Sequence, residues 1–142
     1  MTSGSGRCLC GHLRFKFDPA AVIWTGFCHC ESCRRATASP VTAFFGVRDS
    51  AWRWSGAAPA RYESSPGVRR SFCPRCGTQM AFESQRHPGE IHGYTATLDD
   101  PEALPPDRHF HAEEALGWLH MADDLPRLHG PSGQIEPSAA RG

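Results

Sequence analysis

The chain has 142 residues, and its 15 Lys and Arg balance its 15 Asp and Glu, so the formal net charge is zero. This length fits one domain with a modest core, and the lack of a basic excess argues against a nucleic-acid partner. Every apolar run falls well short of the roughly 20 residues that span a bilayer. The first residues, MTSGSGRCLCGH, lack the pattern of a signal peptide. We therefore expect a cytoplasmic protein without a membrane or nucleic-acid partner.

The hydrophobic pattern predicts a mainly β fold. Residues 12–17, HLRFKF, alternate between polar and apolar side chains. They predict a strand whose buried face carries Leu13, Phe15 and Phe17. Runs rich in β-branched and aromatic residues predict further strands at 41–47, 51–54, 60–64, 67–73, 78–84, 90–98 and 108–112.

Helix is predicted in two short segments only. One runs from Glu31 to Ala38, with Glu31 favourably placed at the N-terminal end of the helix dipole, and the other covers residues 112–119. The end of the chain is rich in Gly, Pro and Ser, which predicts disorder. The expected organisation is one domain at residues 6–128, followed by a disordered tail at residues 129–142.

Seven cysteines dominate the chemistry of the sequence. An odd number without an export signal is a poor basis for disulfides, so these spacings favour metal binding in a reducing compartment. The residues are Cys8, Cys10, Cys28, Cys30, Cys33, Cys73 and Cys76.

The spacing divides the cysteines into four and three. Two distant pairs, Cys8-x-Cys10 and Cys73-x-x-Cys76, predict a four-thiolate structural zinc site. Its binding free energy would count toward folding, on the order of 10 kcal/mol or more. Gly11 and Gly77 follow the pairs and can adopt the positive φ of a zinc knuckle. The alternative is that the two pairs are buried, reduced thiols.

The stretch CHCESC places Cys28, Cys30 and Cys33 so close together that they should share one ion. Three protein ligands with an open position are typical of catalytic zinc. The alternative is that a histidine closes the site, which would make the protein a binding module. His29 should point away from the metal, so the candidates include His12, His92, His109 and His111.

Several motifs together resemble one known family. In order they are GRCLCGHLRF, CHCESCRRAT, FCPRCGTQMAF, PGEIHGYTATLDDP, RHFHAEEALGW and DDLP. The chain resembles the glutathione-dependent formaldehyde-activating enzymes, a family that includes centromere protein V-like proteins. The resemblance implies a zinc-stabilised β-tent of twisted antiparallel sheets, with one or two short helices. It also implies a structural zinc at Cys8, Cys10, Cys73 and Cys76 and a catalytic zinc at Cys28, Cys30 and Cys33.

The resemblance further implies a carbon–sulfur lyase-type activity, in which glutathione and formaldehyde give S-hydroxymethylglutathione. The alternatives are a non-catalytic zinc module that binds a protein partner or carries a thiol, and, by analogy of fold alone, a chaperone or exchange factor. One departure concerns the loop after the helix, where Thr37-Ala38 replaces the common Thr-Gly. Ala38 would tolerate a left-handed turn less well than Gly.

A few other side chains complete the expectations. Arg34 and Arg35 either offset the negative charge of the thiolate cluster or bind a glutathione carboxylate, and the alternative is a solvated helix face. His109 is expected to be a hydrogen-bonded structural histidine, and Phe27 to pack beneath the second metal. The four tryptophans are expected to be core or half-buried aromatics. They are Trp24, Trp52, Trp54 and Trp118.

Overall fold

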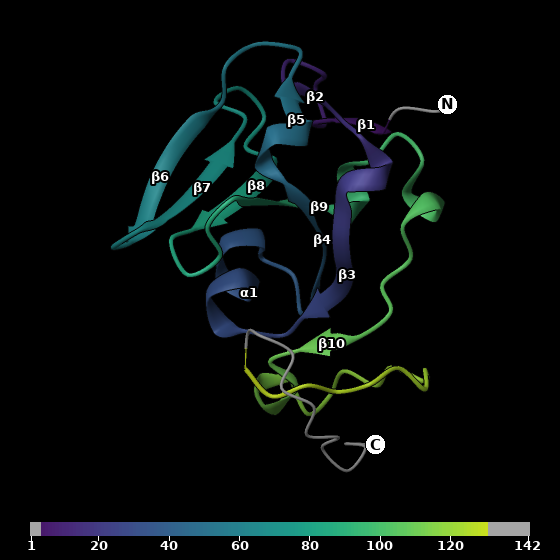
Figure 1. The fold of residues 1–142 in the computed structure, drawn as a ribbon. Helices are drawn as coiled ribbons and strands as arrows, with labels where there is room; N and C mark the ends of the chain where they lie inside the picture. The colour runs from purple at the N-terminus through teal and green to yellow at the C-terminus, as the bar shows by residue number, and fades with distance from the viewer. Residues whose placement is uncertain (1–3, 131–142) are drawn as a thin grey trace. The chain divides into compact units, whose positions relative to one another are not determined.

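The computed structural model describes residues 4–130 (Figure 1), so residues 131–142 of the predicted tail lie outside the described residues. The chain divides into two compact units. Within the described residues, unit 1 consists of residues 4–24 and 45–104, and unit 2 of residues 25–44 and 105–130. Two strands, β3 (Val22–Cys28) and β4 (Thr42–Arg48), carry the chain from one unit to the other.

Unit 1 contains two groups of antiparallel strands. The first is a three-stranded sheet in the order β1-β2-β5, formed by β1 (Gly4–Arg7), β2 (Arg14–Phe17) and β5 (Trp52–Trp54). The second is a meander in which each strand pairs with the next. Its strands are β6 (Ala60–Ser65), β7 (Val68–Phe72), β8 (Gln79–Ser84) and β9 (Glu90–Tyr94). Four 3-10 turns complete the unit: η1 (Pro19–Ala21), η2 (Asp49–Ala51), η3 (Thr95–Thr97) and η4 (Pro101–Ala103).

The hydrophobic core of unit 1 is aromatic at its centre. Phe15 is fully buried and stacks on Trp52, with the ring centroids 4.2 Å apart. Phe17 contacts Phe45 at a centroid distance of 5.0 Å. Leu13, just before β2, is buried as well, which confirms the alternation predicted for residues 12–17, although the strand itself begins at Arg14. The core also includes Cys8 and Cys73, Val47, Met80, Ala81, Ile91 and Leu98, so two of the predicted metal ligands lie inside it.

Unit 2 is built around a short α-helix. The helix α1 (Glu31–Thr37) begins after Cys30 and ends at Ala38, whose backbone is left-handed with φ 54° and ψ 35°. Strand β10 (His109–Phe110) pairs in parallel with the end of β3, so that Phe110 lies opposite Cys28. The 3-10 turn η5 (Ala112–Glu114) follows β10.

The prediction of a mainly β fold with a short helix is confirmed, and α1 matches its predicted bounds within one residue. Two strands were not predicted. Strand β1 contains no apolar residue, and the Phe17 and Phe15 rings of β2 occupy the space that side chains at Gly4 and Gly6 would need. Strand β3 does have a β-forming composition, VIWTGFC. No helix in residues 4–130 is both long enough and apolar enough to cross a membrane.

Three other expectations need correction. The strand predicted at 90–98 ends at Tyr94 and continues as the turn η3. The helix predicted at 112–119 is only the 3-10 turn η5, because the backbone leaves the helical region at Ala115, where ψ is 140°. Trp118 is 68% exposed rather than half-buried.

Candidate metal centres

Four thiols come together in unit 1 from two distant segments. The Sγ atoms of Cys8, Cys10, Cys73 and Cys76 all lie within 4.8 Å of one another. Cys10 Sγ lies 3.7 Å from Cys8 Sγ and 3.8 Å from Cys73 Sγ. Sulfurs bound at about 2.3 Å around a tetrahedral zinc would be about 3.8 Å apart. The thiols are therefore spaced as a four-cysteine zinc site requires.

Two tight turns build this four-cysteine site. Gly77 has φ 78° and donates its N–H to the Cys73 carbonyl, and Gly11 has φ 80° and bonds in the same way to Cys8. Both glycines thus adopt the positive φ predicted for the knuckles, a region that side-chain-bearing residues avoid. In consequence, backbone N–H groups point at sulfur: Leu13 N lies 3.3 Å from Cys8 Sγ, and Cys76 N lies 3.4 Å from Cys73 Sγ.

These donors favour thiolates, because a hydrogen bond to the charged form lowers a pKa. The clearest case is Cys76, where hydrogen bonds from the Thr78 side chain and backbone lower the pKa to about 5. Thr78 also accepts a hydrogen bond from Leu9 N, which links the two knuckles.

Three thiols come together in unit 2 from one short segment. Cys28 is the last residue of β3, Cys30 is the N-cap of α1, and Cys33 lies in the first turn of the helix. Their sulfurs lie within 4.8 Å of one another. Cys28 and Cys33 are buried, whereas Cys30 is half-buried. Cys33 N points at Cys30 Sγ at 3.4 Å.

The three thiols of this three-cysteine site shift one another's protonation in opposite directions. Hydrogen bonds from Cys28 and Cys33 lower the pKa of Cys30 far below its ordinary value. The same contacts, together with burial, raise the pKa of Cys28 far above its ordinary value. Like charges this close disfavour ionisation of all three thiols, and a bound cation would offset that repulsion. Thiolate sulfur is the ligand that suits zinc.

Within residues 4–130, no histidine joins either group of thiols. His92 bonds to Glu90 at 3.0 Å, and His109 bonds to Asp123. His111 Nδ1 lies near two carboxylates, at 3.2 Å from Glu114 and 3.7 Å from Glu113. The histidine closure weighed from the sequence is therefore not present in the described part of the chain.

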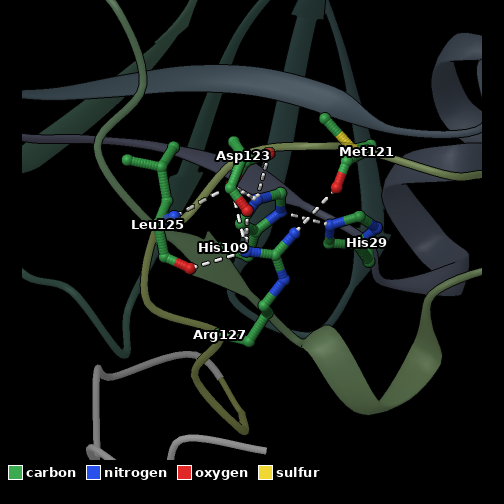
Figure 2. Close-up of polar contacts among 6 residues, drawn as sticks. All are labelled: His29, His109, Met121, Asp123, Leu125 and Arg127. Atoms are coloured by element: carbon green, nitrogen blue, oxygen red, sulfur yellow. Dashed lines mark hydrogen bonds and ion pairs between the residues drawn. The ribbon is translucent and has the colours of Figure 1, made fainter. Parts of the chain in front are cut away.

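A series of polar contacts links His29, which lies between two of these cysteines, to Asp123 and Arg127 (Figure 2). His29 Nε2 lies 2.8 Å from His109 Nδ1, and His109 Nε2 lies 3.0 and 3.1 Å from the two carboxylate oxygens of Asp123. Arg127 donates to Asp123 Oδ1 at 3.0 Å. Both nitrogens of His109 are thus engaged, as expected of a structural histidine, and its ring stacks on Phe27.

Burial and nearby charged groups shift the pKa values of His29 and Asp123. Burial, helped by the positive charges near it, lowers the pKa of His29 to about 4. Burial works against ionisation of Asp123, but the hydrogen bonds from His109 and the Leu125 backbone, together with the positive charge of Arg127, outweigh it, and the pKa of Asp123 is lowered. Asp123 is the first residue of the DDLP motif, but no pattern in the sequence pairs it or Arg127 with His29, which lies more than 90 residues away.

The two arginines after the cysteines differ in their contacts. Arg35 pairs with Glu31 at 2.8 Å on a solvated helix face, with the side chains 78% and 58% exposed. Such a pair contributes little to stability. Arg34 instead donates to the carbonyl of His29 at 3.2 Å, so it supports the segment that carries the thiols.

Comparison with known proteins identifies the family. The family model for the glutathione-dependent formaldehyde-activating enzyme matches residues 3–114. A Halomonas elongata protein provisionally named as such an enzyme is 26% identical over 82% of this chain and 79% of its own length. A Schizosaccharomyces pombe protein named as an uncharacterized lyase is 33% identical over 58% of each chain.

One solved structure shares the fold. It is a Rhodobacter sphaeroides protein, 23% identical, with a TM-score of 0.56 over 72% of this chain and 91% of that one. At this level of identity the likeness concerns the fold alone. The family match spans most of the sequence and contains all seven cysteines. The chain therefore belongs to the glutathione-dependent formaldehyde-activating enzyme family.

Proposed function

We propose that this chain is a zinc-dependent enzyme of the carbon–sulfur lyase type that acts on a thiol–aldehyde adduct. Glutathione and formaldehyde are the favoured pair, because both occur in the name of the family and of the Halomonas elongata relative. The observation that carries the proposal is the three-cysteine site, where three thiols meet without a histidine to close the group in residues 4–130.

We assign one zinc ion to each group of thiols. Cys8, Cys10, Cys73 and Cys76 supply a complete set of four ligands, two of them from the core of unit 1. That set is typical of a structural site. Cys28, Cys30 and Cys33 supply three ligands, the number that catalytic zinc sites retain.

Zinc held by three thiolates would accept one further ligand and would lower the pKa of a thiol bound there. The reaction joins the glutathione sulfur to the formaldehyde carbon, and the thiol proton ends on the former carbonyl oxygen. The burial of the three cysteines indicates where a thiol could reach the site. Cys28 and Cys33 are buried, whereas Cys30 is half-buried, so an incoming thiol would approach on the side of Cys30.

The proposal is tested by calorimetric titration of the zinc-loaded protein with glutathione and with S-methylglutathione, which has no thiol proton to lose. We expect glutathione to bind and the methylated analogue to bind far more weakly. Cys30→Ser should abolish the difference. Ser32→Ala, at an exposed position of the same helix, should preserve it. Equal binding of both ligands, or no binding at millimolar concentration, would contradict the assigned role of the thiol.

Turnover separates an enzyme from a thiol carrier. Exchange between formaldehyde and its glutathione adduct can be followed by NMR, with the spontaneous rate subtracted. An enzyme accelerates this exchange in proportion to its concentration, and Cys30→Ser removes the acceleration. Binding without acceleration would support the carrier alternative.

A further inference from the structure

We infer that Asp123 and Arg127 are positioning residues of the three-cysteine site, which they hold in place through His109 and His29. The inference rests on the proposed function, since it assumes that Cys28, Cys30 and Cys33 bind zinc. It adds a second, long-range support to a site whose ligands are otherwise local in sequence.

His29 is held in place by three hydrogen bonds. Its N–H donates to the Phe110 carbonyl at 3.1 Å, its carbonyl accepts from Arg34, and its ring bonds to His109. His29 is only 4% exposed. Because it lies between Cys28 and Cys30, fixing His29 also fixes the backbone from which two of the three thiols project.

His109 is itself held rigidly by burial and by its backbone hydrogen bonds. It is 1% exposed, its N–H donates to the Pro126 carbonyl at 2.8 Å, and its carbonyl accepts from Leu128 N at 2.7 Å. Its ring therefore has a defined position between His29 and Asp123, as Figure 2 shows.

Arg127 stabilises the segment that carries Asp123 through hydrogen bonds from its guanidinium group. One guanidinium nitrogen donates to the Asp123 carboxylate, to the Asp123 carbonyl and to the Leu125 carbonyl, at 3.0, 3.0 and 2.7 Å. The other donates to the Met121 carbonyl at 3.1 Å. Asp123 Oδ1 also accepts from Leu125 N. Arg127 and the Leu125 backbone thus orient the carboxylate that accepts from His109.

The hydrogen bonds from His29 to Asp123 have a defined donor and acceptor at each contact. An ionised carboxylate can only accept, so Asp123 requires a proton on His109 Nε2. When His109 carries its one proton on Nε2, its Nδ1 is an acceptor, and His29 then donates from Nε2. The carboxylate therefore selects the tautomer of two successive histidines, the second of which lies between zinc ligands. Groups that orient metal ligands from outside commonly alter metal affinity about 10- to 100-fold when they are changed.

The test is zinc transfer to the chromogenic chelator 4-(2-pyridylazo)resorcinol, measured on the full-length, zinc-loaded protein. The wild type should release two zinc ions in two resolved steps. Asp123→Asn should weaken retention at the three-cysteine site about 10-fold and leave the four-cysteine site unchanged. Asp124→Asn is the matched control, because Asp124 is exposed and adjacent, and it should behave as the wild type.

Two further measurements keep the test decisive. Arg127→Lys keeps the charge but cannot make all four bonds, and it should weaken the same step if Asp123→Asn does not fold. In the wild type at pH 8, ¹⁵N NMR should show His29 protonated at Nε2 and not at Nδ1.

The inference is overturned if Asp123→Asn and Asp124→Asn release zinc alike, if both zinc ions are weakened together, or if His29 carries its proton on Nδ1. A wild type that holds a single zinc would overturn the proposed function, and the inference with it.

Discussion

Ala38→Gly should stabilise the protein, although the substitution removes a side chain. Ala38 is exposed and left-handed, at φ 54° and ψ 35°, and its N–H closes α1 by donating to the Arg34 carbonyl. A left-handed backbone costs a residue with a Cβ about 1–2 kcal/mol. Glycine avoids this cost but has more conformational entropy to lose on folding, about 0.4–1 kcal/mol. The net gain is about 0.7 kcal/mol, or about 3 °C in Tm for a chain of this size.

Ala36→Gly is the matched control, two residues earlier in the same helix. Its backbone is helical, so the substitution should cost about 1 kcal/mol instead. Urea denaturation of the zinc-loaded proteins in one zinc buffer measures both changes. The reasoning is refuted if Ala38→Gly is neutral or destabilising while Ala36→Gly shows its expected cost, because that pattern would mean that the end of the helix is not strained.

The other predictions concern the thiols and a buried histidine. Cys76→Ser should lower the melting temperature strongly, because it breaks a site that joins distant segments of the chain. Cys30→Ser should lose one zinc with a much smaller decrease, since its site is local in sequence, and equal decreases would mean that both sites are structural. Burial lowers the pKa of His92 from 6.5 to about 4, so the unfolded chain binds more protons between these pH values and stability decreases as the pH falls through this window. The full effect is about 3 kcal/mol. Urea denaturation from pH 7.5 to 4 should show this decrease in the wild type and a smaller one in His92→Gln, and identical pH profiles would contradict it.

The elements with a strong local pattern could be predicted from the sequence. The alternation of Leu13, Phe15 and Phe17 specified the buried face of β2, because a strand places every second side chain on the same side. The thiols lie in the same two groups that their spacing predicts, since short C-x-C and C-x-x-C loops leave little freedom. That each group holds zinc stays a prediction.

The elements without a local pattern could not be predicted from the sequence. Strand β1 forms because two glycines leave room for aromatic rings from β2, and GSGR by itself has no strand propensity. Asp123 and Arg127 reach His109 and His29 only through the fold, across intervals for which the sequence has no periodicity. The left-handed backbone at Ala38 is a middle case. The comparison with Thr-Gly pointed to it, and the structure shows it.

The central claim is that the chain carries two metal centres, one closed and one open. Native mass spectrometry of protein purified under reducing, chelator-free conditions tests it most directly. We expect two zinc ions in the wild type and one in Cys30→Ser, and we expect glutathione to add one molecule to the wild type only. A wild type with one zinc or none, or a Cys30→Ser variant that retains both zinc ions, would contradict the account.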